Sequence, residues 1–192
     1  MDLKSMTNDE LWQLFPIILK PHNPQYANWY RSEVKLLNKI LGQNIIKRIS
    51  HIGSTSVHNL LAKPTIDILL EVENENVLET IKAKLEEEKY ICHKQKDAFK
   101  LQSLMCLKGY TDKGFAEQVF HVHIRVVNNH KELYFRDYLR DHPDVALQYG
   151  ELKLELLKKY EHHRDNYTDS KSDFINKYTE AAKHIYLDRY KI

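Results

Sequence analysis

Alternation between apolar and polar positions predicts the strands of this chain. Residues 45–51 and 65–72 read as two strands, separated by a Gly-Ser-Thr-Ser turn and a short helical piece through residue 61. Shorter apolar runs predict an edge strand at residues 17–19 and further strands at residues 90–93, 101–108 and 118–127. The turn formers at residues 109–114 favour a hairpin between the last two strands.

Apolar positions three to four residues apart predict the helices. The first two cover residues 9–14, opened by the capping box of Thr7 and Glu10, and residues 25–41, closed by Gly42. The remaining helices are expected at residues 74–88, 131–140, 144–163 and 170–186, with a turn at 166–169 before the last. Together the elements predict an α+β fold, a mixed β-sheet with flanking helices followed by a helical C-terminal part.

Length and composition predict a single domain over residues 1–192. We place its mixed sheet core in residues 1–129 and its helical part in residues 130–192. The 42% hydrophobic and 29% charged contents are those of an ordinary globular protein. A net charge of +2 argues against nucleic acid as a partner.

The cysteine count and the apolar runs bear on the cellular compartment. Cys92 and Cys106 lie in apolar strand-like runs, which favours two buried free thiols over a disulfide or a metal pair. No apolar run is long enough to cross a bilayer, and the first residues lack the pattern of a signal peptide. We therefore expect a cytoplasmic protein without a membrane partner.

A buried acid and a small-residue turn mark the candidate site. Asp67 sits inside an apolar strand, where a carboxylate costs free energy unless a cation or hydrogen-bond donors meet it. In the preceding turn, Gly53 allows close backbone approach, and Ser54, Thr55 and Ser56 offer hydroxyls and amides to phosphate oxygens. A Gly-Ser turn, a short helix and a strand carrying Asp is the order in which a nucleotidyltransferase core holds a metal-bound triphosphate.

Two motifs, His-Ile-Gly-Ser-Thr-Ser-Val at residues 51–57 and Ala-Lys-Pro-Thr-Ile-Asp-Ile at residues 62–68, resemble the signature of the GrpB-like family. The resemblance extends over nearly the whole chain, through Pro21, Pro24, Trp29, His121, His123, Phe135, Arg136, Arg140, His142, Pro143, Tyr149, Lys153, Lys171 and Phe174. It implies the nucleotidyltransferase superfamily fold. Some members of the family are fused to dephospho-coenzyme A kinase.

Metal-assisted phosphoryl transfer normally uses two or three carboxylates. Strand alternation places Asp67, Leu69 and Glu71 on one face, so Leu69 stands where the superfamily pattern has a second acid. We name Asp67 and Glu71 as the candidate catalytic acids. The alternative for Asp67 is a structural acceptor of loop amides. For Glu71 the preferred interpretation is a solvated charge at the end of the strand.

A second set of candidates comes from the strand at residues 118–127, where His121, His123 and Arg125 share one face. If this strand lies next to Asp67, the two imidazoles complete a metal site with that carboxylate. Such a set suits Zn²⁺ better than Mg²⁺, which prefers oxygen ligands. Arg125 would then be a cation for phosphate. The alternative is that all three are polar residues on a wetted sheet face.

Other cations could reach the same pocket. Lys63 precedes Pro64, whose ring forces an extended chain, so its ammonium is a candidate phosphate ligand or an exposed loop lysine. Lys171 is a candidate phosphate ligand from the C-terminal helices. Arg136 and Arg140 share one helix face, either as part of the site or in surface ion pairs. His51 either caps the Gly-Ser turn or donates to a phosphate.

These residues support three hypotheses. The first is metal-dependent transfer of a nucleotidyl group from a nucleoside triphosphate to a small acceptor. The second is a non-catalytic module on the same fold that binds a nucleotide or a coenzyme A-type phosphate, favoured by the missing second acid. The third is a metal-dependent phosphohydrolase. All three require a nucleotide or phosphorylated small molecule as ligand. The expected cofactor is a divalent metal, Mg²⁺ or Mn²⁺, with Zn²⁺ as the alternative.

Overall fold

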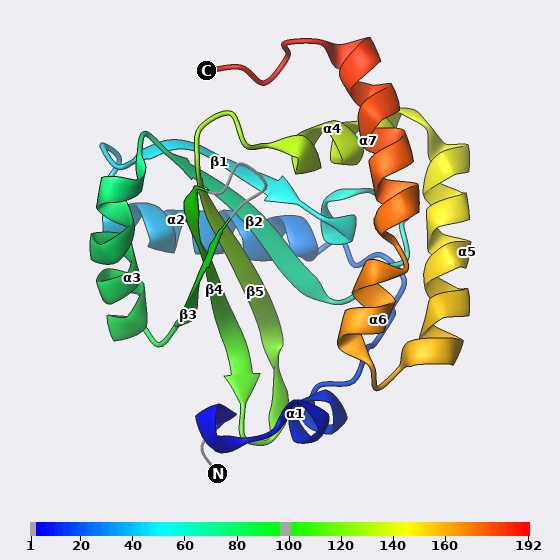
Figure 1. Cartoon of the computed structure of the whole chain (residues 1–192), viewed down its shortest axis with the longest axis horizontal. Coiled ribbons are helices and arrows are strands. Elements are labelled where there is room, and N and C mark those ends of the chain that lie inside the picture. The colour runs from blue at the N-terminus through cyan, green and yellow to red at the C-terminus, as the bar shows by residue number, and fades with distance from the viewer. Residues whose placement is uncertain (1–2, 97–100) are drawn as a thin grey trace.

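A computed structural model describes residues 3–96 and 101–192 of the chain. Its centre is a five-stranded mixed sheet with the strand order β1-β2-β5-β4-β3 (Figure 1). The strands are β1 (Ile46–Ile52), β2 (Thr65–Val72), β3 (Ile91–Lys96), β4 (Gln102–Thr111) and β5 (Gly114–Val126). Only β2 and β5 pair in parallel, and the other neighbours are antiparallel. The predicted α+β fold with a mixed sheet is thus confirmed.

Helices cover both faces of the sheet. The α-helices are α1 (Asn8–Leu14), α2 (Tyr26–Leu41), α3 (Leu78–Glu87), α4 (Lys131–Asp141), α5 (Pro143–Tyr160), α6 (Arg164–Asp169) and α7 (Ser172–Tyr186). Short 3-10 turns precede α1, β2 and α3: η1 (Leu3–Ser5), η2 (Ser54–Ser56) and η3 (Glu75–Val77). None of the helices in the described part of the chain combines the length and apolar character needed to cross a membrane.

Strand β2 divides the hydrophobic core. Ile66, Ile68 and Leu70 pack with α2 and α3 on one face, while Leu69 packs on the other face with α4 and α7 (Figure 1). This confirms the alternation expected for residues 65–72. Through Leu69, α4 and α7 share a core with the sheet, so this core extends across residue 129. The predicted division of the domain into a sheet core and a helical part at that residue stays a prediction.

Three predicted elements are wrong. Residues 17–19 form no edge strand, because Ile17 donates its N–H to Glu161 O and the only bridge in this segment joins Lys20 to Ala62. The short helical piece expected after the Gly-Ser turn and through residue 61 is absent from this described part of the chain, and the 3-10 turn covers only residues 54–56, within the Gly-Ser-Thr-Ser turn itself. The turn expected at residues 166–169 is instead the last four residues of α6.

The cysteine prediction is also wrong. Cys92 on β3 and Cys106 on β4 are directly opposite each other in the antiparallel ladder, with their Cα atoms 4.1 Å apart, and they form a disulfide. The apolar runs correctly placed both side chains in the interior, where each is less than one-tenth exposed. The pairing depends on the β3–β4 register, which the separate runs do not specify.

Candidate metal and phosphate site

Three potential metal ligands meet on the face of β2 and β5 that looks toward the C-terminal helices. The parallel register places Asp67 beside His121 and Leu69 beside His123, which confirms that the two strands are neighbours. Asp67 Oδ1 lies 3.3 Å from His121 Nδ1 and 3.5 Å from His123 Nε2. Within the described residues these three side chains form the group able to hold a metal ion, with one ligand atom from each.

The spacing of these atoms fits a transition metal. In a tetrahedral site with bonds of about 2.0–2.1 Å, ligand atoms are separated by about 3.3 Å. The two distances from Asp67 Oδ1, 3.3 and 3.5 Å, are close to that edge. Two imidazoles and one carboxylate are ligands typical of Zn²⁺ and similar ions, whereas Mg²⁺ prefers oxygen. The residues present therefore fit a divalent metal, with one coordination position left for a ligand.

The electrostatics of Asp67 favour its charged form. Burial by itself would raise the pKa of the Asp67 carboxyl, but hydrogen bonds from His121 and His123, and their charge, lower it well below its ordinary value. Burial lowers the pKa of His121 in spite of the neighbouring carboxylate. An ionised carboxylate and a neutral imidazole are the protonation states that bind metals.

Tyr110 on β4 orients the His121 ring from the side opposite Asp67. Its hydroxyl lies 2.7 Å from His121 Nε2, the ring nitrogen that faces away from Asp67, and it also receives an N–H from Arg164 at 3.3 Å. When Nδ1 acts as a ligand, Nε2 carries the proton and donates it to the tyrosine oxygen. The β4–β5 ladder is irregular between Lys108 and Tyr110, and this irregularity aligns Tyr110 with Phe115 of β5.

A cavity of about 540 Å³ opens in front of Asp67 and His121 and is lined by the cations Lys63, Arg164 and Lys171. Burial, together with Arg164 and Lys171, lowers the pKa of Lys63 to about 7. Burial also lowers the pKa of Lys171, to about 8, although Asp67 opposes this shift. The three cationic side chains, which stand beside the carboxylates of Asp67, Asp165 and Asp169, offer binding partners for a polyanion such as a phosphate chain.

Helix α6, which the sequence pattern does not predict, contributes to this cavity. Arg164, Asp165 and Asp169 all line it, and Thr168 lies between them. Arg164 and Asp165 lie between the helix predicted at residues 144–163 and the turn predicted at residues 166–169, and Asp169 lies in that turn. The acids four residues apart, on one helix face, were the available signal.

Gly53 is packed against the catalytic candidate Asp67. A β-carbon at position 53 would clash with the Asp67 carboxylate, and the Gly53 φ of 70° lies in the region that favours glycine. The prediction was close approach of this backbone to a ligand. The structure adds close approach to the carboxylate itself, so Gly53 helps set the position of Asp67.

The hydroxyls of the turn differ in their roles. Lys153, only 3% exposed, reaches from α5 to donate to Ser54 Oγ at 3.0 Å and also to Leu61 O. Thr55 donates its hydroxyl to Thr65 O, and Ser56 donates its own to Gly53 O. Thr55 therefore ties the turn to the start of β2 and Ser56 bonds within the turn, while Ser54 lines a cavity.

His51 caps the turn. Its Nε2 lies 3.0 Å from Thr55 Oγ1, and its ring stacks on Tyr30 with centroids 4.7 Å apart. Because the Thr55 proton goes to Thr65 O, His51 Nε2 is the donor in this pair. Burial lowers the pKa of His51 to about 4, so the imidazole is neutral near pH 7.

Arg136 and Arg140 tie α4 to the same turn. Arg136 donates to His51 O at 3.0 Å and Arg140 donates to Ser56 O at 2.8 Å. Both also pair with Asp137. The two arginines thus combine the ion pairing that we anticipated with support of the turn that borders the site.

Arg125 and Glu71 are engaged elsewhere. Arg125 forms an ion pair with Glu132 at 2.7 Å. The preferred interpretation of Glu71 as a solvated strand-end charge is wrong, because Glu71 is 0% exposed and paired with Arg48 and His130. The strand end is covered by the C-terminal segment, where Tyr190 O accepts a hydrogen bond from Arg48.

A second cavity, of about 460 Å³, adjoins the first and shares Thr168 and Lys171 with it. Gly53, Ser54 and His123 line it from the sheet side. From the helices, Phe135, Leu139, Tyr149 and Ile175 contribute an apolar and partly aromatic wall, and the other helix residues of the lining are polar or charged. The candidate ligands of the metal thus stand between a cationic cavity and one with an aromatic wall.

A mixed sheet that sets a Gly-Ser turn against an aspartate on the next strand, under a layer of C-terminal helices, defines a protein of the nucleotidyltransferase fold. A crystal structure of the Cid1 poly(U) polymerase bound to MgATP matches with a TM-score of 0.50 and 11% identity. The match covers 79% of this chain and 45% of that chain, and at this identity it shows the fold alone.

The chain belongs to the GrpB family, whose model, described as GrpB protein, matches residues 16–181. The crystal structure of conserved protein GrpB from Enterococcus faecalis is 31% identical, with a TM-score of 0.75 over 88% of this chain and 99% of that one. UPF0157 protein YqkA of Bacillus subtilis is 32% identical over 165 residues, 84% of this chain. The chain spans only 46% of the length of YqkA.

Proposed function

We propose that this protein is a metal-dependent nucleotidyltransferase that moves a nucleotidyl group from a nucleoside triphosphate to a small acceptor. The observation that carries the proposal is the convergence of Asp67, His121 and His123 beside a Gly-Ser turn and a cavity lined by three cations. A carboxylate with a lowered pKa and two imidazoles provide a metal site.

In this proposal the two adjoining cavities bind different parts of the nucleotide. The aromatic wall formed by Phe135 and Tyr149 takes the base and sugar, and the phosphates extend past Ser54 toward Lys171 and Lys63. A divalent metal at Asp67, His121 and His123 would act as a Lewis acid on a phosphate oxygen. The chain itself holds the phosphates in place and supplies cations where negative charge increases during transfer.

The second candidate is a binding module that holds a nucleotide or coenzyme A-type phosphate without turning it over. The specific observation in its favour is the single carboxylate on this face. Leu69 occupies the position of a second acid, and Glu71 is paired with Arg48 and His130. With one acid in the ligand set, a pair of bridged metal ions lacks its usual carboxylate support.

Calorimetry and product analysis distinguish these functions. Protein freed of any His-tag is titrated with ATP, CTP, GTP or dephospho-coenzyme A in the presence of Mg²⁺, Mn²⁺ or Zn²⁺. We expect metal-dependent binding of a nucleotide and slow release of pyrophosphate. Asp67→Asn should weaken the binding at least about ten-fold, the scale expected for loss of a charged ligand.

A matched control shows whether the metal dependence comes from this site or from histidines elsewhere on the protein. His123→Ala should abolish the metal dependence, whereas His93→Ala, on the exposed part of β3, should leave it unchanged. Tight nucleotide binding without product supports the binding module. Release of inorganic phosphate from a generic ester supports the phosphohydrolase. A nucleotide affinity that is the same with and without metal, and the same in Asp67→Asn, contradicts the proposed site.

A further inference from the structure

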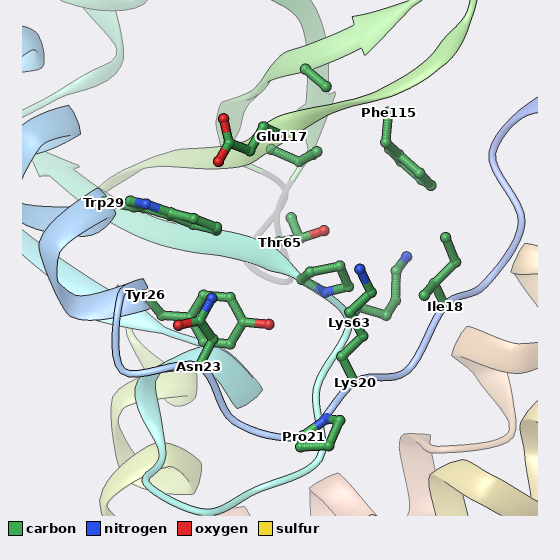
Figure 2. Close-up of a pocket in the computed structure, with 13 residues that line it drawn as sticks. Ile18, Lys20, Pro21, Asn23, Tyr26, Trp29, Lys63, Thr65, Phe115 and Glu117 are labelled. Carbon is green, nitrogen blue, oxygen red and sulfur yellow. The ribbon is translucent and has the colours of Figure 1, made fainter.

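A third cavity, of about 540 Å³, lies at the end of the sheet where β2 and β5 begin. Figure 2 shows the indole of Trp29 on one side of it and the ring of Phe115 on the opposite side. Tyr26 contributes a further aromatic wall and directs its hydroxyl toward the centre. The lining is thus largely aromatic and apolar, as is usual for small-molecule sites.

This cavity adjoins the candidate metal site. It shares Lys63 and Thr65 with the cationic cavity in front of Asp67. Thr65 and Val119, which pair with each other, precede Asp67 and His121 by two residues on their strands. Two residues along a strand correspond to about 6–7 Å, so a ligand in the third cavity would reach the neighbourhood of the metal ligands.

The charged groups of the cavity favour an anion. The amino groups of Lys20 and Lys63 point into the same space (Figure 2). Within residues 3–96 and 101–192, neither amino group forms a hydrogen bond or an ion pair. Glu117 is the one acid in the lining, and it lies exposed on the rim near Trp29. Two unpaired cations beside flat aromatic rings match a planar molecule with an acidic group.

We propose that this cavity binds the acceptor, and that the acceptor is a small aromatic or otherwise planar molecule that carries a carboxylate or a phosphate. The proposal rests on the nucleotidyl transfer inferred above. Lys20 holds the acidic group, and Lys63 lies between this group and the nucleotide phosphates. Trp29 and Phe115 enclose the ring, and a hydroxyl of the acceptor faces the shared segment at Thr65. The lining disfavours a polycationic acceptor, because two lysines would repel it.

The transfer that follows balances in atoms and charge. The acceptor hydroxyl oxygen forms a bond to the α-phosphorus of the nucleotide. The bond from that phosphorus to the oxygen bridging the β-phosphorus breaks, and pyrophosphate leaves with the bonding electron pair. The hydroxyl proton is released to solvent. The position of the third cavity, next to the cationic one at Lys63 and Thr65, gives the acceptor its own entrance.

Tryptophan fluorescence offers a direct test, because the chain has two tryptophans and Trp12→Phe leaves Trp29 as the reporter. The probes are 4-hydroxyphenylacetate, phenyl phosphate and the cation tyramine. We expect a saturable change in Trp29 emission with either anion, and binding of tyramine at least about ten-fold weaker, as expected for loss of a charge-assisted contact. The tighter of the two anions identifies the acidic group.

Matched variants distinguish this proposal from the proposed function. Lys20→Met should weaken anion binding about five- to ten-fold, since one charged hydrogen bond is lost. Lys35→Met, an exposed lysine of α2, should not. Asp67→Asn should remove metal-dependent nucleotide binding and leave anion binding intact, because Asp67 does not line this cavity.

Three results would overturn the acceptor site. They are the absence of any anion-induced change, equal binding of tyramine, and unchanged anion binding in Lys20→Met. Saturable anion binding by a protein that binds no nucleotide would overturn the acceptor role and the proposed function together. Nucleotide binding that persists while anion binding is absent would overturn the acceptor site alone.

Discussion

At the scale of single residues, the position of Asp67 depends on what surrounds it. Gly53 abuts the carboxylate from the turn, and His121 and His123 donate to it from the next strand. The carboxylate stays charged because hydrogen bonds and imidazole charge outweigh the effect of burial on its pKa. The aspartate therefore serves as the meeting point of three segments, and its neighbours are as important to the site as its own charge.

Gly53→Ala tests this arrangement. A methyl group at position 53 would clash with the Asp67 carboxylate, and a φ of 70° is unfavourable for alanine. We expect the free energy of unfolding to fall by about 1–3 kcal/mol and the affinity for Zn²⁺ or Mn²⁺ to fall with it. Urea unfolding and metal titration measure the two effects.

The control for this substitution is Gly150→Ala. Gly150 lies inside α5, and a β-carbon there would meet Leu60 and Leu61 at an ordinary 3.9 Å. Alanine should stabilise this helix by up to about 1 kcal/mol and leave metal affinity unchanged. Equal behaviour of the two variants would show that Gly53 does not set the position of Asp67.

At the scale of elements, the Gly-Ser turn is held by α4 and α5 in addition to its own hydrogen bonds. Lys153 of α5 is buried and donates to Ser54 Oγ and to Leu61 O, at the two ends of the segment between β1 and β2. Arg140 of α4 donates to Ser56 O. The C-terminal helices thus hold in place a turn that belongs to the sheet part of the chain.

A pH-dependent stability follows for Lys153. Burial lowers its pKa from 10.5 to about 7. The unfolded chain therefore binds more protons than the folded one between these values, and the lysine's contribution to stability increases as pH rises through that interval. Lys153→Met removes this contribution. The free energy of unfolding of the native protein minus that of the variant should therefore be larger near pH 9 than near pH 7.

Urea unfolding at both pH values measures that difference. Lys158→Met, which changes an exposed lysine of the same helix, provides the baseline. The titration of Lys63 is common to native protein and variant and cancels in the comparison, whereas the repulsion between Lys171 and Lys153 is part of the measured difference. A difference between native protein and Lys153→Met that does not change with pH would contradict the lowered pKa.

At the scale of the whole molecule, Glu71 connects segments far apart in the sequence. It is fully buried in β2 and pairs with Arg48 of β1 and His130 at the start of α4. Arg48 also donates to Tyr190 O near the C-terminus. Burial would raise the pKa of Glu71, but hydrogen bonds from His130 and Arg48 lower it, so the carboxylate stays charged.

Glu71→Gln removes that charge and leaves Arg48 and His130 without a carboxylate partner. We expect a loss of about 3–5 kcal/mol in the free energy of unfolding, the range for breaking a buried ion pair from one side. Glu79→Gln, whose exposed carboxylate pairs with Lys94, should change stability by less than about 1 kcal/mol. Urea unfolding measures both variants. Equally small losses in the free energy of unfolding would show that the ion pairs of Glu71 are not important to the fold.

The sequence predicted the main elements well wherever a pattern was long and regular. The strand at residues 65–72 and the capping box at Thr7 and Glu10 were both predicted correctly. Short elements were less predictable. Residues 17–19 carry an apolar run, but their partner is Glu161 O in a distant segment, and no local pattern reveals such a contact.

The sequence by itself determined the fold class, the place of Asp67 on a buried strand and the shared face of His121 and His123. These follow from local alternation of side chains, which depends only on backbone geometry. The tertiary structure alone decided which residues meet. It pairs Glu71 with Arg48 and His130, joins Cys92 to Cys106, and brings α6 to the cavity in front of Asp67. Such contacts depend on strand register and helix packing, which join residues that are distant along the chain.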